Sequence, residues 1–315
     1  MSPTFATGTV DLQRHARGEN VWLRAAGADE QSVLNGLRAQ QLNYRVLDSE
    51  EAVGRAMLDE IIESAGEKSG DLTIVLLGGR GAQALHRLIG EKAKTDELDT
   101  LLARLNVFTQ DALAPMRADN PFSFVRDFER LLGPAFFKKV RSFNSMNTEA
   151  TDLEAEFADY LTRLEQSEGI DIFFLGLGPE ANAASHLCYI RPGSGATAID
   201  IGGMIPISPG LIEHHITKFK AGGAAISETG EQECRNASHI LTLGPAPMLR
   251  AKKIVQSIVD ADTAPAKVAS FKRLIESPIA EDGFARAAQV DENPGLWIRL
   301  HDNVRSYVLS NVVPS

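Results

Sequence analysis

An acidic residue closes one apolar run of the chain, at a place where it could do acid–base chemistry. Asp111 comes directly after the run LNVFTQ at 105–110. A carboxylate within hydrogen-bond reach of a carbon acid can serve as a general base near neutral pH. The alternative is a cap on an exposed loop or helix, a common use of Asp. A second polar group follows the run IDIFFLGLG at 170–178 and consists of Glu180, Asn182 and His186.

Glycines and basic side chains elsewhere in the chain could bind an anion. The run DLTIVLLGG at 71–79 ends in a turn formed by Gly78, Gly79, Arg80 and Gly81. Backbone amides of such a turn can cradle phosphate, and a guanidinium can pair with phosphate or carboxylate. Lys267, near the start of a predicted helix, is a usual point-charge partner for phosphate. Solvated surface roles are the alternatives for Arg80 and Lys267.

The elements around these residues predict an α/β protein. Apolar runs at 71–79, 105–110 and 170–178 read as strands, and amphipathic stretches at 49–68 and 148–169 read as helices. This alternation predicts a modified Rossmann-like fold, with a largely parallel sheet flanked by helices on both faces. In open parallel sheets ligands bind beyond the carboxyl ends of the strands, so residues that follow the strands are the candidates for chemistry.

Residues 1–43 are polar, with Trp22 and Leu23 isolated, and we expect an N-terminal extension packed on or beside a main domain at 44–315. The net charge of −10 gives no footprint for nucleic acid or an anionic membrane. The two cysteines, Cys188 and Cys234, predict neither a disulfide framework nor a zinc site. With no leader segment or long apolar run, we expect a cytoplasmic protein without metal or organic cofactor. The sequence leaves room for a homo-oligomer.

The residues after the three strands resemble, in order, those of the glucosamine-6-phosphate deaminase and 6-phosphogluconolactonase family. They read LLGGRGAQAL, then FTQDALAP with NPFSFVRDF, then LGLGPEANAAS. Other segments match in the same order: RVLDSEEAVGRAMLDEI, IRPGSG, LTLGPAPMLRAKKIV and TAPAKVASFKRLIE. The resemblance covers residues 44–302 and implies a sugar-phosphate enzyme on a modified Rossmann-like fold.

The resemblance also implies roles for individual residues. Asp111 matches the carboxylate that moves a proton between C1 and C2 of the open sugar. Lys267 matches a phosphate-binding lysine, and Gly178 belongs to the Gly-x-Gly of the third loop. In the glycine turn, Leu77 and Arg80 replace the hydroxyl residues of the family's phosphate loop.

The third loop departs from the family pattern of an acid and a ring-opening histidine. Glu180 keeps the acid, but Asn182 stands where the histidine is expected, and Leu187 where a second carboxylate is expected five positions on. An asparagine cannot exchange a proton near pH 7. If a helix begins in this loop, His186 shares a face with Asn182 and could serve instead. Otherwise His186 packs beside its neighbours in the chain.

The resemblance therefore implies an isomerase or deaminase with Asp111 as base and an altered substrate, a phosphorylated sugar or amino sugar. Two alternatives remain at this point. One is a 6-phosphogluconolactonase-type hydrolase, in which Glu180 would have to activate water. The other is a sugar-phosphate-binding protein that has lost catalysis.

Overall fold

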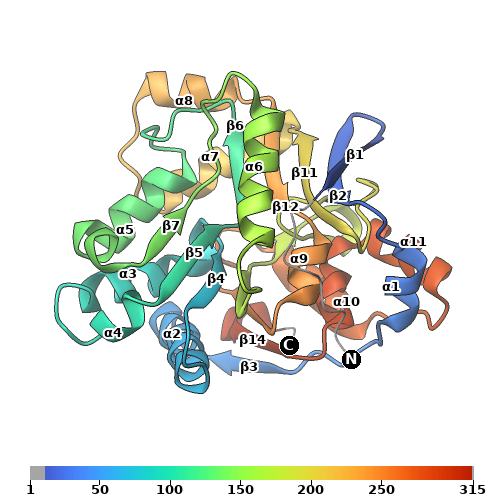
Figure 1. The fold of residues 1–315 in the computed structure, drawn as a ribbon, viewed down its shortest axis with the longest axis horizontal. Helices are drawn as coiled ribbons and strands as arrows, with labels where there is room; N and C mark the ends of the chain where they lie inside the picture. Colours follow the sequence, from blue (N-terminus) through green and yellow to red (C-terminus); the bar gives the residue numbers. More distant parts are fainter. Residues whose placement is uncertain (1–10, 314–315) are drawn as a thin grey trace.

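The computed structural model describes residues 11–313, and its centre is a seven-stranded sheet in which every neighbouring pair of strands is parallel (Figure 1). The predicted α/β fold is thus confirmed, and the three predicted strands are β4, β5 and β8. In spatial order the strands are β3 (Tyr44–Leu47), β14 (Val304–Leu309), β13 (Lys253–Ile258), β8 (Ile172–Leu175), β4 (Leu72–Leu76), β5 (Leu105–Thr109) and β7 (Ser142–Asn144).

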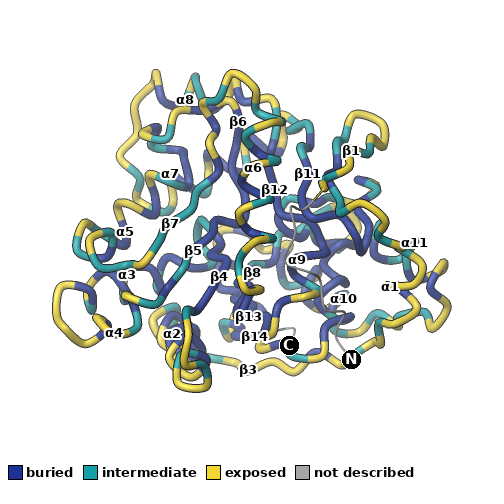
Figure 2. Tube along the Cα trace, viewed as in Figure 1, coloured by how far each residue is buried: buried dark blue, intermediate teal, exposed yellow. Residues whose placement is uncertain are grey.

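Helices cover both faces of this sheet, so its central strands are buried on both sides (Figure 2). On β4, Val75 packs into one core cluster while Ile74 and Leu76 pack into the other. One cluster takes in α2 (Glu50–Glu67), α3 (Gln83–Lys92) and α5 (Phe124–Lys139), and the other α6 (Leu153–Glu165), α9 (Pro245–Arg250) and α10 (Ala266–Glu276). Strands buried on both faces need the continuous apolar runs seen in the sequence.

A second, antiparallel sheet packs beside the first and includes part of the N-terminal segment. Its order is β1 (Leu12–Arg17), β2 (Asn20–Ala25), β11 (Asp200–Pro206), β12 (His239–Leu243) and β6 (Asp111–Ala114). Trp22 is fully buried, and its indole donates a hydrogen bond to the Ser194 carbonyl. Residues 12–25 of the predicted extension are therefore strands of this sheet, whereas 1–10 and 314–315 lie outside the described residues.

The two predicted helices form with somewhat shorter bounds. Ser49 caps α2 by accepting a hydrogen bond from the Ala52 amide at 3.1 Å, as its place before the apolar pattern indicates. The second helix, α6, begins at Leu153 rather than near residue 148, with Asp152 as its cap. The remaining helices are α1 (Glu30–Gly36), α4 (Asp99–Leu102), α7 (Pro209–Ala221), α8 (Glu228–Arg235) and α11 (Gly283–Glu292). None of the helices within residues 11–313 combines the length and apolarity that crossing a bilayer requires.

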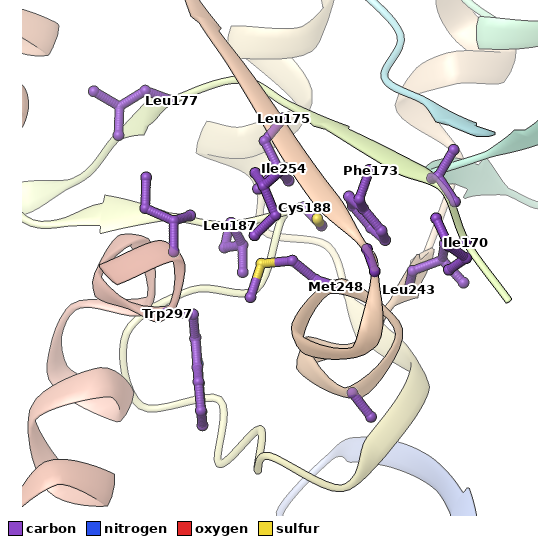
Figure 3. Packing of buried hydrophobic residues seen from close by; sticks show 14 of the residues in the cluster. Ile170, Phe173, Leu175, Leu177, Leu187, Cys188, Leu243, Met248, Ile254 and Trp297 are labelled. Carbon is purple, nitrogen blue, oxygen red and sulfur yellow. The ribbon is translucent and has the colours of Figure 1, made fainter. Parts of the chain in front are cut away.

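The core beneath β8 anchors the loop that follows this strand (Figure 3). Phe173 and Leu175 of β8 pack in one cluster with Met248 and Trp297. Leu187 and Cys188 belong to the same cluster, so the chain returns to the core directly after His186. The polar residues at 180–186 are thereby held between two buried segments.

A buried histidine has no hydrogen-bond partner among the described residues. His86 of α3 is fully buried beside Phe128, and neither ring nitrogen finds a partner. Burial lowers the pKa of His86 to about 3. Because the unfolded chain binds this proton more readily, His86 makes the folded state lose stability as the pH falls from about 6.5 toward 3.

We expect His86→Leu to raise the free energy of unfolding by about 1–2 kcal/mol at pH 7, because it removes buried polar atoms without partners. The gain should grow at pH 5. Urea unfolding at both pH values measures it, with His239→Leu, at a half-buried site bonded to Ser238, as the matched control. A loss of stability in His86→Leu with unchanged pH dependence would contradict this account.

Candidate active site

A cavity opens where the carboxyl ends of the parallel strands meet. The loops after β4, β8 and β13, the start of β6 and one face of α7 line it. Eight residues singled out from the sequence line this one cavity: Gly78, Gly79, Arg80, Gly81, Asp111, Gly178, His186 and Lys267. Glu180 lies directly behind His186, as its hydrogen bond shows. Most of the candidate residues that follow the parallel strands thus lie together in one cavity.

Asp111 sits in the wall of the cavity and is only 5% exposed. It is the first residue of β6, opposite Thr242 of β12, so the sheet fixes its backbone. Burial raises the pKa of Asp111 to about 7. A carboxyl group with such a pKa can both take and return a proton at neutral pH.

The loop after β8 forms a small β-hairpin and not the helix considered from the sequence. Its strands are β9 (Gly178–Pro179) and β10 (Ser185–His186), joined through a turn of 3₁₀ helix at Ala181–Ala183. The amide and hydroxyl of Ser185 both donate to the Asn293 side chain, which pins β10. His186 therefore reaches the cavity from a strand that lies across from Gly178.

Glu180 and His186 are hydrogen-bonded to each other. The His186 Nδ1 lies 2.9 Å from Glu180 Oε1 and donates to it, since a carboxylate only accepts. Arg191 binds both oxygens of the same carboxylate, each at 3.0 Å, and also donates to Ser208 Oγ. Burial would raise the pKa of Glu180, but the bonds from His186 and Arg191 outweigh it and lower that pKa to about 2. Glu180 is thus ionised at neutral pH and orients the imidazole.

Gly178 is needed for this arrangement. A Cβ atom at this position would lie 1.7 Å from His186 Nε2. We expect Gly178→Ala to displace the imidazole and break its bond to Glu180, which the NMR signals of the His186 ring would report. Gly66→Ala, where a Cβ meets nothing within 4 Å, is the control. An unchanged His186 spectrum in Gly178→Ala would contradict the geometry.

The structure does not bring Asn182 to the cavity. Its side chain is exposed in the hairpin turn, where its φ is 56°, and its carbonyl accepts a hydrogen bond from Arg273 on α10. Asparagine tolerates this left-handed conformation better than most residues. The geometry thus gives Asn182 the place of a turn residue.

Three cationic side chains, Arg80, Lys218 and Lys267, line the same cavity close to one another. Lys218 of α7 and Lys267 of α10 both pair with the buried Asp260, Lys218 at 2.5 Å. Arg80 extends from the glycine turn and pairs with Glu50 at 2.5 Å. Its Nε atom is buried without a hydrogen-bond partner among the described residues.

The charges of this cluster leave it net positive. Burial would raise the pKa of Asp260, but its two lysines hold that pKa below the usual range, while burial lowers the pKa of Lys267 against the pull of Asp260. Two carboxylates thus pair with three cations, and the glycine turn at 78–81 lines the same cavity. Unused donors remain on both ammonium groups and on Arg80 Nε. Such a cluster can bind a phosphate group.

Sequence reasoning missed Lys218, Asp260 and Arg191. Asp260 lies two residues after β13, so its place behind a parallel strand could have marked it as a candidate once this strand was recognised. Lys218 and Arg191 carry no such signal, because they come from a helix and a loop that only the tertiary fold brings to the cavity.

Comparison with known proteins agrees with this arrangement. The profile of the family described as glucosamine-6-phosphate isomerases/6-phosphogluconolactonase matches residues 48–203. A glucosamine-6-phosphate deaminase of Cutibacterium acnes is 23% identical over 237 residues, or 75% of this chain and 81% of the relative. The chain is thus similar to this family over residues 48–203.

Two solved structures share this fold. A monomeric glucosamine-6-phosphate deaminase has a TM-score of 0.65 at 19% identity and covers 86% of this chain and 98% of its own. A 6-phosphogluconolactonase from Trypanosoma cruzi has a TM-score of 0.60 at 14% identity and covers 88% and 97%. At these identities the likeness establishes the fold alone, so the branch of the family follows from the site.

Within the family pattern, the hairpin changes which residues correspond. The structure places His186, and not Asn182, beside the loop acid Glu180. Five positions after His186 stands Arg191, whereas Leu187, five positions after Asn182, is buried in the core. This chain therefore has an acid and a histidine in the third loop, with an arginine where the family pattern, counted from His186, has a second carboxylate.

Proposed function

We propose that the protein is a sugar-phosphate isomerase or deaminase with an altered substrate, in which Asp111 is the base. One observation carries this proposal. A single cavity is lined by a buried carboxyl group with a pKa of about 7, by His186 in its pair with Glu180, and by a cluster of three cations. The two free cysteines and a phosphorylated substrate suit a cytoplasmic enzyme.

The proton transfer assigned to Asp111 is balanced within the sugar. Asp111 takes the proton from C2 of the open-chain aldose while the oxygen at C1 gains a proton, which gives the enediol. The same carboxyl then returns a proton to C1 while the hydroxyl at C2 loses its proton and becomes the ketone. In a 2-amino sugar the product at C2 is an imine, which water hydrolyses to a ketone and ammonia. No redox partner is required.

The remaining groups bind and orient the substrate. The phosphate would lie against the turn at 78–81 and take the free donors of Lys218 and Lys267. His186, oriented by Glu180, leaves Nε2 to exchange a proton with a sugar hydroxyl or ring oxygen. Arg191 binds both carboxylate oxygens of Glu180 and so fixes it as the partner of His186. The presence of this arginine is one reason to expect a substrate different from that of the relatives.

The Glu180–His186 pair also supports a second candidate, a 6-phosphogluconolactonase-type hydrolase. An imidazole held by a carboxylate can activate water for attack on a lactone. The earlier alternative, with Glu180 as the group that activates water, is weaker because Arg191 and His186 occupy both of its oxygens.

Turnover assays on one preparation separate the candidates. The protein is incubated with glucosamine 6-phosphate, other aldose phosphates and 6-phosphogluconolactone. Ammonia release or aldose–ketose conversion supports the proposal, and acid release from the lactone alone supports the hydrolase. A melting temperature raised by phosphosugars without any turnover would point to a binding protein.

A further inference from the structure

Tyr189 spans the cavity wall between two histidines. Its ring stacks on the His186 ring, with centroids 5.5 Å apart and planes inclined by 11°. Its hydroxyl oxygen lies 3.2 Å from Nδ1 of His215 on α7. All three residues line the cavity. The hydroxyl of Tyr189 therefore lies on the same wall as the imidazole that Glu180 orients.

The direction of the Tyr189–His215 hydrogen bond is fixed by the other side of the His215 ring. His215 Nε2 lies 2.8 Å from the carbonyl oxygen of Phe122, which can only accept, so Nε2 carries a proton. Burial lowers the pKa of His215 to about 4, and the ring is neutral at pH 7. Nδ1 therefore accepts the hydrogen bond, and the Tyr189 hydroxyl is its donor.

The backbone that holds Tyr189 in this position is conformationally strained. Cys188 and Tyr189 both have positive φ angles, 48° and 60°, which is unfavourable for residues with these side chains. Thr242 Oγ1 donates to the Cys188 carbonyl, and a bridge between Leu187 and Ile190 closes the turn. Strain of this kind concentrates at functional sites because the surrounding structure must enforce it.

The cavity surface near Asp111 is therefore rich in acceptors. Burial and the nearby Asp111 raise the pKa of Tyr189, which keeps its proton and offers only oxygen lone pairs to a ligand. Asp111 accepts when ionised. His186 uses Nδ1 as a donor to Glu180, so Nε2 accepts when the ring is neutral.

We propose that Tyr189 is a specificity-determining residue, whose oxygen accepts a hydrogen bond from an N–H or O–H group on C2 of the ligand, the carbon from which Asp111 would take the proton. The ligand class is a phosphorylated sugar that carries an amine or hydroxyl at this carbon. The inference rests on the proposed function in one respect, namely that C2 of the sugar phosphate lies against Asp111.

Binding to three probes tests this role without any turnover. Asp111→Asn protein is titrated calorimetrically with glucosamine 6-phosphate, glucose 6-phosphate and 2-deoxyglucose 6-phosphate, which differ only in the group at C2. We expect the amino or hydroxyl probe to bind about 3- to 10-fold more tightly than the deoxy probe, the range for one net hydrogen bond. Tyr189→Phe in the same background should remove this preference and leave the deoxy affinity unchanged. Tyr44→Phe, at a half-exposed site on β3, is the control.

A second variant tests the same role if Tyr189→Phe fails to fold. His215→Phe keeps an aromatic ring against Phe219, 4.3 Å away, but frees the Tyr189 proton to donate. The preference for a donor at C2 should fall here too. A preference that survives in Tyr189→Phe, or equal or undetectable binding of all three probes before this substitution, would overturn the proposal. Because the readout is affinity, the inference can hold even where no sugar is turned over.

Discussion

We expect Asp111→Asn to slow turnover of a sugar phosphate strongly while leaving its binding almost intact. Asparagine has nearly the same shape but cannot take a proton from carbon. General-base contributions are about 10²- to 10⁴-fold in rate, so kcat should fall by this factor with KM little changed. Steady-state kinetics on the substrate identified by the turnover assays provides the measurement.

The pH dependence of the wild-type enzyme follows from the same residue. Burial raises the pKa of Asp111 to about 7, and only the ionised carboxylate is a base. The kcat/KM should therefore rise tenfold per pH unit below 7 and level off above it, until another group titrates. Asp302→Asn, at a side chain that is 90% exposed, should leave rate and profile unchanged. Full activity of Asp111→Asn would remove Asp111 from the chemistry.

The second large effect is expected at Lys267, at the phosphate end of the cavity. Lys267→Met keeps much of the aliphatic stem but removes the buried ammonium group. A hydrogen bond to a charged group contributes about 1.5–3 kcal/mol, so affinity for a phosphosugar should fall roughly 10- to 150-fold. Competitive binding of inorganic phosphate should weaken by a similar factor.

The comparison that isolates the phosphate is between phosphorylated and unphosphorylated sugars. Lys267→Met should lower affinity for the former alone. Lys94→Met, at a lysine paired with Glu91 on the surface, is the matched control. Equal losses for both sugars would indicate that Lys267 and Asp260 support the fold instead of the ligand.

The sequence predicted the parallel sheet well, because strands buried on both faces require continuous apolar runs such as IFFL at 172–175 and LTIVL at 72–76. It also placed Asp111 and the glycine turn, since residues after parallel strands converge. The second sheet was missed, because β1 is mostly polar and β2 joins the sheet only by pairing with β11, far along the chain.

The part of the site formed by residues 178–186 was harder to predict, because the turn of the hairpin decides which side chains reach the cavity. A local pattern could not show that residues 178–186 form a hairpin, which is pinned by Asn293 and Ser270 from distant segments. That hairpin selects His186 over Asn182 as the partner of Glu180. Lys218 and Arg191 likewise reach the site only through tertiary packing.

The most direct test of the central claim follows the hydrogen at C2. Aldose and 2-amino-aldose phosphates labelled with deuterium at C2 are incubated with the wild-type enzyme and with Asp111→Asn, and the label is located by NMR. We predict that the wild type moves deuterium from C2 to C1 or to water and that Asp111→Asn does not. Deuterium fully retained at C2 with the wild type, whether through hydrolysis or through lack of reaction, would contradict proton transfer by Asp111.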